Sequence, residues 1–300
     1  MSNAANERET KMSKVESLVN SQCILGEGPL WVADRKKVFW VDIKTGVLYC
    51  LKTDNGHLAQ WHFSTPLTSI VERTNGRYFG TTAQGFVEID LEGTKLNLIG
   101  GPEIENVSNR HNDAKVDPFG NLWSGTMDDN EVHLSGNLYC LDKFGRCEVR
   151  DTNYCVSNGP TFSPNGQILY HTDTFQRRIF QYKLSPDGKL SDKRLFVEIE
   201  PKDGFPDGMT TDVEGNIWVC LYGGHKIIRF SPEGKLLEEF PMPCANITSC
   251  AFGGDNMDLL YITTAKWTLS EREIAEQPLS GNLLVMTTNT QGVASEKYQG

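Results

Sequence analysis

Apolar and polar positions alternate along this chain in short runs, and one arrangement of them recurs six times. Each copy begins with a turn-forming cluster of Asp, Asn or Gly and continues into a run of apolar or aromatic residues. The clusters and their runs occupy residues 34–37 and 38–40, 75–77 and 78–79, 117–121 and 122–123, 163–167 and 168–170, 212–216 and 217–218, and 253–256 and 259–261. The copies recur at roughly 40 to 50 residues, the length of one four-stranded propeller blade. The pattern therefore predicts an all-β, six-bladed β-propeller.

The residues that follow these runs also favour strands. A later strand of each unit is rich in β-branched and aromatic residues, as in Gly46-Val47-Leu48-Tyr49, Gly136-Asn137-Leu138-Tyr139 and Lys226-Ile227-Ile228-Arg229-Phe230. Turns of the form Asp-x-x-Gly supply the positive φ that a tight hairpin requires. A pair of β-sandwiches would also be all-β, but sandwiches do not repeat at this period. The propeller therefore remains the preferred interpretation.

Length and composition fit a propeller that uses nearly the whole chain. The 300 residues are 38% hydrophobic and 10% aromatic, which is enough apolar side chain to bury a large core. No linker interrupts the repeats, so we assign residues 21–300 to one propeller domain with a central metal-binding channel. Ser2-Asn3-Ala4 resembles a cloning scar, and we interpret residues 1–20 as a tag remnant and flexible N-terminus.

The charge and the cysteines limit the expected partners and compartment. A net charge of −10 and a pI near 5.2 would repel nucleic acid and anionic membrane surfaces, so neither is expected as a partner. The first twenty residues lack the apolar stretch of a signal peptide, and the eight cysteines show no Cys-x-x-Cys or metal-finger spacing. We therefore expect free, buried cysteines and a cytoplasmic protein. Without an amphipathic partner helix, we also expect a monomer.

Four polar segments lie where the inner strand of a blade should begin. They are Leu25-Gly26-Glu27-Gly28-Pro29, Asn109-Arg110-His111-Asn112-Asp113, Val156-Ser157-Asn158-Gly159-Pro160 and Phe205-Pro206-Asp207-Gly208-Met209. Taken singly, each could be an ordinary turn. Inner strands converge on the channel where propellers bind ligands, so Glu27, Asn158 and Asp207 would point to one axis from different blades. Two carboxylates and an amide oxygen suit Ca²⁺, Mg²⁺ or Mn²⁺, and are acceptable to Zn²⁺ or Fe²⁺.

These segments, in this order, resemble the family of regucalcin (senescence marker protein), gluconolactonases and the luciferin-regenerating enzyme. The matching stretches are residues 26–31, 110–118, 122–127, 157–160, 205–208 and 215–218. The resemblance runs from about Cys23 to about Met286, so it includes every predicted blade. Residues 170–174, 263–266 and 269–270 are most similar to bacterial aldonolactonases, including xylonolactonases and arabinonolactonases.

By this resemblance, the family's single divalent metal maps onto Glu27, Asn158 and Asp207. Lactone hydrolysis needs a nucleophilic water and a stabilised oxyanion, and a metal with open coordination positions supplies both. We assign Asp207 the catalytic role of accepting a proton from the attacking water while it binds the metal. Glu27 would balance charge, and Asn158 would fix geometry without adding a third negative charge.

The resemblance also implies a sugar-binding pair. The family's substrate-contacting Arg and Asn correspond to Arg110 and Asn112, whose guanidinium and carboxamide would hold sugar hydroxyls and the ring oxygen. An acidic residue that some members place after Gly-Thr-Met falls near Asp129 or Asn130, and the alignment puts Asn130 there. The implied substrate is an aldono-1,4- or 1,5-lactone such as xylonolactone, arabinonolactone or gluconolactone.

Several polar residues keep two interpretations. His111 and His171 could act as base or ligand, or could hydrogen-bond a neighbouring strand. Asp173 lies within a predicted strand and could face the channel or serve a structural role. The chain has no Gly-x-Ser-x-Gly elbow and no Gly-rich phosphate loop, which removes serine-hydrolase and nucleotide-binding interpretations.

Three functions from different classes remain open. The first is a metal-dependent sugar lactonase, which the metal triplet and the Arg-Asn pair favour. The second is a calcium-binding regulatory protein of regucalcin type without significant lactonase turnover. The third is a non-catalytic propeller that presents a protein-binding face, which needs no polar channel. Turnover of an aldonolactone distinguishes the first from the other two.

Overall fold

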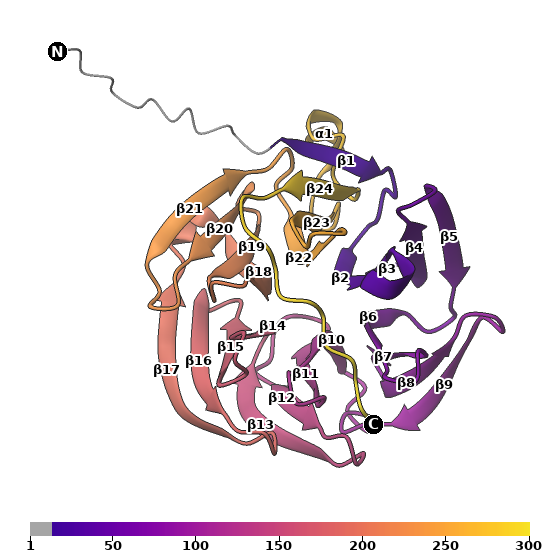
Figure 1. Ribbon diagram of the computed structural model, residues 1–300, viewed down its shortest axis with the longest axis vertical. Coiled ribbons are helices and arrows are strands. Elements are labelled where there is room, and N and C mark those ends of the chain that lie inside the picture. The colour runs from indigo at the N-terminus through magenta and orange to yellow at the C-terminus, as the bar shows by residue number, and fades with distance from the viewer. Residues whose placement is uncertain (1–13) are drawn as a thin grey trace.

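Six four-stranded antiparallel sheets surround a central axis in the computed structural model, which describes residues 14–300 (Figure 1). Each sheet is one blade, and its strands succeed one another from the axis to the rim. The predicted six-bladed propeller is confirmed. This architecture brings the inner strands of all six blades to one channel.

Consecutive strands build five of the blades, the innermost strand first. The first two blades contain β2 (Gly26–Val32), β3 (Lys37–Asp42), β4 (Val47–Lys52) and β5 (His57–His62), then β6 (Leu67–Glu72), β7 (Tyr78–Thr82), β8 (Gly85–Asp90) and β9 (Lys95–Gly100). The third and fourth contain β10 (Asn109–Val116), β11 (Leu122–Asp128), β12 (Gly136–Leu141) and β13 (Cys147–Tyr154), then β14 (Ser157–Phe162), β15 (Ile168–Asp173), β16 (Arg178–Leu184) and β17 (Leu190–Glu198). The fifth contains β18 (Phe205–Thr211), β19 (Ile217–Tyr222), β20 (Lys226–Phe230) and β21 (Leu236–Pro241).

The sixth blade joins the two ends of the chain. Its three inner strands are β22 (Ile247–Gly253), β23 (Leu259–Thr264) and β24 (Leu283–Thr287), and its outer strand is β1 (Val15–Val19). β1 pairs antiparallel with β24, starting with Val15 opposite Met286. An N-terminal strand therefore closes the ring by completing the last sheet.

This closure changes the expected domain boundary. We expected residues 1–20 to be flexible, but residues 15–19 form a strand, so the propeller begins at Val15 rather than at residue 21. A strand whose partner lies at the other end of the chain has no local turn pattern to reveal it. Residues 1–13, which include the expected cloning scar, lie outside the described residues.

An aspartate turn explains two of the repeated polar clusters. Asp117 accepts hydrogen bonds from two backbone N–H groups of its own turn and from the indole Nε1 of Trp123 at 2.8 Å. Asp212 repeats this arrangement with Trp218 at 3.0 Å, and it also accepts from Arg229 Nε at 3.0 Å. Each aspartate thus fixes the inner hairpin and the orientation of the tryptophan that follows.

Aromatic side chains fill the spaces between neighbouring blades. The Trp123 ring centroid lies 6.4 Å from that of Phe162 on β14, and the Trp218 centroid lies 5.4 Å from that of Phe252 on β22. Each such ring removes about 150–250 Å² from water, so these contacts hold adjacent blades together. All eight cysteines are free, as expected, and all except Cys147 are buried.

The C-terminal segment crosses one face of the ring, the face toward the viewer in Figure 1. Val293 N–H donates to Thr211 O at 3.2 Å in the fifth blade, and Tyr298 N–H donates to Glu72 O at 2.8 Å in the second. Tyr298 is buried, with its ring 5.1 Å from that of Phe79. This segment therefore ties two distant blades together and covers one end of the channel.

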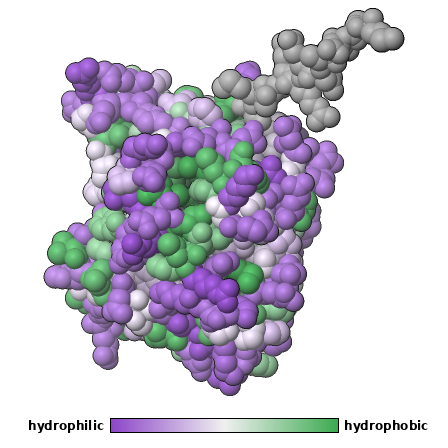
Figure 2. Space-filling model, turned by 90° about the vertical axis from the view of Figure 1, so that its left-hand side faces the viewer, coloured by the Kyte–Doolittle hydropathy of each residue, from purple (hydrophilic) through white to green (hydrophobic). Residues whose placement is uncertain are grey.

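Helical structure is confined to short connections. The α-helix α1 (Glu271–Glu276) begins with a capping box formed by Ser270 and Glu273, and two 3₁₀ turns span Ala33–Arg35 and Pro201–Asp203. Within residues 14–300, no helix has the length and apolar character needed to cross a membrane. The side of the ring shown in Figure 2 is largely hydrophilic, with hydrophobic atoms gathered near its middle.

We expect Asp212→Ala to lower the free energy of unfolding by about 3–5 kcal/mol. The change leaves the Arg229 guanidinium and the Trp218 indole N–H without their buried acceptor. Asp142→Ala is the matched control, because, among the described residues, Asp142 caps a similar turn through two backbone N–H groups, bonds no tryptophan, and pairs only with the exposed Arg146. Asp142→Ala should lower the free energy of unfolding by only about 1 kcal/mol, as measured by denaturant unfolding. Equal losses in the two variants would contradict the assigned role of the indole and guanidinium contacts.

Candidate functional site

A β-bulge in every inner strand shapes the wall of the channel. In β2, two residues separate the paired positions Glu27 and Leu30, whereas one residue separates their partners Val41 and Phe39. The same excess of one residue occurs in the other inner strands, between Leu67 and Ser69, His111 and Ala114, Asn158 and Thr161, Pro206 and Met209, and Ile247 and Ser249. A bulge bends the strand and re-aims its side chains. Each predicted site segment lies at one of these bulges.

The structure gathers the predicted metal triplet at the start of three inner strands. Glu27, Asn158 and Asp207 are each 4–5% exposed and come from β2, β14 and β18. Asn158 Nδ2 donates to Thr174 Oγ1 at 2.9 Å, and this hydroxyl donates at 3.0 Å to the carbonyl of Pro206. Asn158 is therefore linked to the residue that precedes Asp207.

Buried negative charge is concentrated here. Burial raises the pKa of Glu27 well above its ordinary value, and the charge of Asp113 adds to this shift. Burial likewise raises the pKa of Asp207, with the charges of Glu27 and Asp113 contributing. Carboxylates that repel one another at low exposure require a cation or protons for neutralisation.

The donor set fits a divalent cation. Among the described residues, no hydrogen-bond donor reaches Asp207 Oδ1, although this atom is buried. An unpaired buried carboxylate oxygen is costly, and hard cations bind such oxygens. No group of three or more His, Cys, Asp or Glu side chains within residues 14–300 is arranged to hold a metal. A metal at this position would therefore depend on the amide oxygen of Asn158 together with Glu27 and Asp207.

A chain of hydrogen bonds places the predicted sugar-binding pair beside the triplet. Arg110 Nη1 donates to Asn112 Oδ1 at 2.6 Å, and Asn112 Nδ2 donates to Asn158 Oδ1 at 2.6 Å. Arg110 and Asn112 are 8% and 6% exposed, so their polar atoms lie in the channel wall rather than on open surface. The structure thus brings both residues together with Asn158.

Asp129, rather than Asn130, lies against Arg110. Asp129 Oδ1 accepts from Arg110 Nε at 2.8 Å, and its side chain is 53% exposed. Asn130 is exposed in the turn after β11, where its N–H donates to Asp128 Oδ1 at 3.3 Å. The carboxylate next to Arg110 in the structure is therefore that of Asp129. The role proposed for Asn130 in substrate binding stays a prediction.

The two candidate histidines are packed between blades. His111 Nδ1 lies 2.8 Å from Ser124 Oγ, and His171 Nε2 lies 3.0 Å from Ser157 Oγ. Both side chains are fully buried, and burial lowers the pKa of His111 to about 4 and that of His171 to about 3. An imidazole that stays neutral and is hydrogen-bonded to a serine is suited to a structural role rather than to proton transfer. Asp173 accepts from the Gln176 N–H of its own turn, which fits a structural role.

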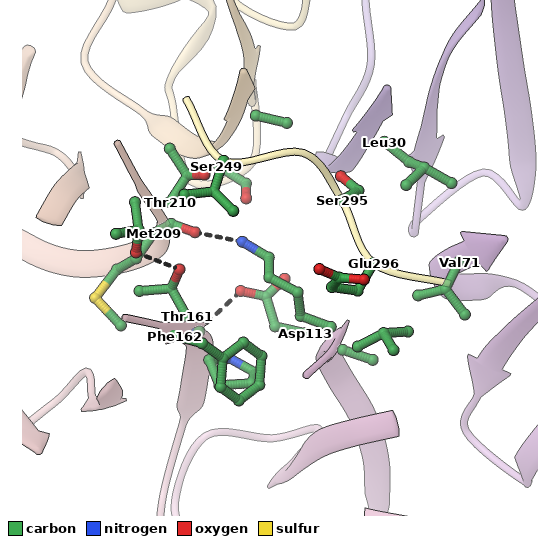
Figure 3. Close-up of a pocket in the computed structure, with 18 of the residues that line it drawn as sticks. Leu30, Val71, Asp113, Thr161, Phe162, Met209, Thr210, Ser249, Ser295 and Glu296 are labelled. Carbon is green, nitrogen blue, oxygen red and sulfur yellow. Dashed lines mark hydrogen bonds between the residues drawn. The ribbon is translucent and has the colours of Figure 1, made fainter. Parts of the chain in front are cut away.

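Asp113 and Lys115 are channel residues to which sequence reasoning gave no role. Both line a cavity of about 80 Å³ between the inner strands and the C-terminal segment (Figure 3). Burial raises the pKa of Asp113 to about 6, an effect that the charge of Lys115 opposes. The sequence did hold a signal, since Asn112 and Asp113 are consecutive polar residues in a strand, where neighbouring side chains normally face opposite sides of the sheet. Such a pair indicates a bulge that turns both side chains inward.

Comparison with known proteins agrees with this geometry. Residues 25–266 match the family described as "SMP-30/Gluconolactonase/LRE-like region". The chain belongs to this family. It is 30% identical to the 6-deoxy-6-sulfogluconolactonase of Pseudomonas putida, over 95% of this chain and 99% of that protein. It is also 30% identical to Bos taurus regucalcin, over 96% of this chain and 99% of that protein. A crystal structure of regucalcin from Agrobacterium tumefaciens, called a calcium-binding protein, shares the fold with a TM-score of 0.91 at 24% identity, covering 95% of this chain and 97% of that one. The resemblance inferred from the motifs is confirmed.

We expect the neutral, buried His171 to make the protein less stable as the pH falls. In the unfolded chain, His171 takes up a proton below a pKa of about 6.5. In the folded chain, burial lowers the pKa of His171 to about 3, so the ring stays neutral. The free energy of unfolding therefore decreases as the pH falls from about 6.5 to about 3. His171→Gln should reduce the loss between pH 7 and pH 5 by about 2 kcal/mol in denaturant unfolding of chelator-treated protein. His57→Gln, on the exposed strand β5, should leave the wild-type loss unchanged. An unaltered loss in His171→Gln would contradict the assignment.

Proposed function

We propose that this protein is a metal-dependent sugar lactonase that hydrolyses an aldono-1,4- or 1,5-lactone to the aldonic acid. The observation that carries the proposal is the buried cluster of Glu27, Asn158 and Asp207 beside the hydrogen-bonded pair Arg110 and Asn112. Two comparisons support the reaction class, because the matched family includes gluconolactonases and one similar protein is named a 6-deoxy-6-sulfogluconolactonase. The identity of the sugar and the metal remain part of the proposal.

The cation site would be formed by Glu27, Asn158 and Asp207, and a bound divalent cation would polarise the lactone carbonyl and lower the pKa of water. Asp207 accepts a proton from the attacking water while the oxygen of that water bonds to the carbonyl carbon of the lactone. The bond from that carbon to the ring oxygen then breaks, and the ring oxygen takes up the proton that Asp207 accepted and becomes a hydroxyl. The sum is lactone plus water giving the aldonic acid, which ionises at neutral pH.

The polar pair explains the preference for a polyhydroxylated substrate. Arg110 is held from two sides, by Asp129 and by Asn112, which fixes the guanidinium plane at the mouth of the channel. The half-exposed Asp129 carboxylate can accept hydrogen bonds from sugar hydroxyls, while Arg110 donates to oxygen. An apolar ester would cover the remaining donor and acceptor positions of these groups without offering them a partner, which is the strongest basis for rejection by a polar site.

A pH-drop assay over a panel of 1,4- and 1,5-aldonolactones tests the proposed reaction. Full-length protein is stripped with a chelator and reloaded separately with Ca²⁺, Mg²⁺, Mn²⁺, Zn²⁺ or Fe²⁺. We expect turnover of at least one lactone that depends on the added ion and exceeds the uncatalysed rate by at least about 10⁶-fold. Ion binding without turnover of any lactone would favour the calcium-binding regulatory alternative. Equal turnover with and without ions would contradict the metal dependence.

Asp207→Asn tests the role of this carboxylate. The variant keeps an amide oxygen in place of one carboxylate oxygen but cannot accept the proton, so we expect kcat to fall by about 10²–10⁴-fold at full metal occupancy. Occupancy is measured on the same sample by elemental analysis. Asp173→Asn is the control, because Asp173 is also a buried carboxylate but bonds within its own turn. Near-normal kcat in fully loaded Asp207→Asn would eliminate the proposed role.

A further inference from the structure

One segment of β10 reaches the strands of two candidate metal ligands. Asn112 Nδ2 donates to the carbonyl of Ser157 at 2.9 Å as well as to Asn158 Oδ1. The next residue, Asp113, accepts at Oδ2 from the backbone N–H of Gly159 at 3.0 Å. Consecutive side chains of β10 therefore bond to three consecutive residues of β14, with Asn158 in the middle.

Lys115, two residues further along β10, bonds to the strand that carries Asp207. Its Nζ donates to the carbonyl oxygen of Met209 at 2.6 Å (Figure 3). Met209 is the first paired residue after the β18 bulge, and the unpaired residues of that bulge are Asp207 and Gly208. The ammonium of Lys115 thus anchors the downstream end of the bulge that carries Asp207. Strand β14 of the fourth blade lies between these two blades in the ring, so this contact spans the channel.

The residue type suits this position. A long side chain is needed to cross from the third blade to the fifth, and a donor is needed because the target is a backbone carbonyl. A buried ammonium requires a nearby negative charge, which Asp113 provides from the same strand. The pair thus adds no net charge to the hub, so the charge available for a cation remains that of Glu27 and Asp207.

We propose that Lys115 is a positioning residue that fixes Asp207 for metal binding and catalysis by anchoring the β18 bulge across the channel. The effect on turnover rests on the lactonase function proposed above, whereas the effect on metal affinity does not. Lys115 touches neither the reacting atoms nor the metal. Its contribution is to hold the backbone on which Asp207 is mounted.

Two physical roles for Lys115 predict opposite signs. If Lys115 acted only through its charge, removing a positive charge near the site would tighten cation binding. If Lys115 anchors the bulge, its removal lets Asp207 move and weakens cation binding despite the charge that is lost. The sign of the change in affinity therefore separates the two roles.

Lys115→Met provides the test, because methionine keeps an unbranched apolar chain and lacks the donor. Mn²⁺ and, separately, Ca²⁺ are titrated calorimetrically into chelator-stripped, full-length wild type and variant. We expect the dissociation constants to rise about 10- to 100-fold. At saturating metal, kcat for the best lactone should fall at least about tenfold while KM changes little, because Arg110 and Asn112 remain in place. Unchanged or tighter ion binding would overturn the proposal.

Thr161→Val is the matched control. It removes another buried hydrogen bond between the fourth and fifth blades, the one that joins Thr161 Oγ1 and Thr211 Oγ1 at 2.9 Å. Thr161 and Thr211 lie near the ends of β14 and β18, beyond the bulge that carries Asp207. Its melting temperature should fall without a change in ion affinity. If Lys115→Met does not fold, Lys115→Gln replaces it, since its uncharged amide is too short to reach the carbonyl of Met209 from the third blade and should show the same direction of change. Equal loss of affinity in Thr161→Val would also overturn the proposal.

The outcomes for this proposal and for the lactonase function are distinguishable. If wild-type protein binds an ion but hydrolyses no lactone, the proposed function fails, while the comparison of dissociation constants still decides the role of Lys115. If wild-type protein hydrolyses a lactone and Lys115→Met matches it in affinity and kcat, the function stands and the positioning role fails. Wild-type protein that binds neither ion would overturn both.

Discussion

Mutual repulsion among carboxylates at the hub is the constraint on which the site depends. A propeller must bring its inner strands to one axis, and in this chain three of those strands carry Glu27, Asp113 and Asp207. Water is largely excluded there, so these charges cannot be screened as they would be on a surface. Bonds from neighbouring blades offset part of this repulsion, and a cation held at the hub would offset the rest.

The charge at the hub matches a divalent cation. Arg110 pairs with Asp129, and Lys115 lies beside Asp113 in a cavity that Glu296 also lines. Within residues 14–300 neither Glu27 nor Asp207 forms an ion pair, and the pKa of each is raised. A dication neutralises this pair completely, and Asn158 adds an oxygen without further charge. This balance explains why the third donor is an amide rather than another carboxylate.

Local patterns in the sequence predicted the features that local physics determines. The turn clusters around Asp117 and Asp212 revealed the blades, because the aspartate that makes each turn also binds the tryptophan that follows. The positions of Glu27, Asn158 and Asp207 in the channel could be predicted for a similar reason, since each lies at the start of an inner strand, whereas their role as metal ligands stays a prediction. Contacts between distant segments could not be predicted in this way. Strand β1 and the C-terminal crossing segment find partners only in the closed ring.

The finer geometry of the site also depends on tertiary structure. Six bulges re-aim the side chains of the inner strands, and where each bulge lies depends on how the strand pairs with its neighbour. The contact between Arg110 and Asp129 joins a strand to a turn, and a turn has neither helical nor strand periodicity from which such a contact could be predicted. The contact of Lys115 with another blade exists only in the closed ring, so no role could be assigned to this residue from the sequence alone.

The central claim is that one divalent cation is bound at the hub by Glu27, Asn158 and Asp207. A crystal of the full-length protein soaked in Mn²⁺ and measured near the manganese absorption edge tests this directly through anomalous scattering. The account predicts one strong peak within the channel, in contact with oxygen atoms of all three side chains. An absent peak, or a peak bound elsewhere with the three side chains turned away from one another, would contradict it.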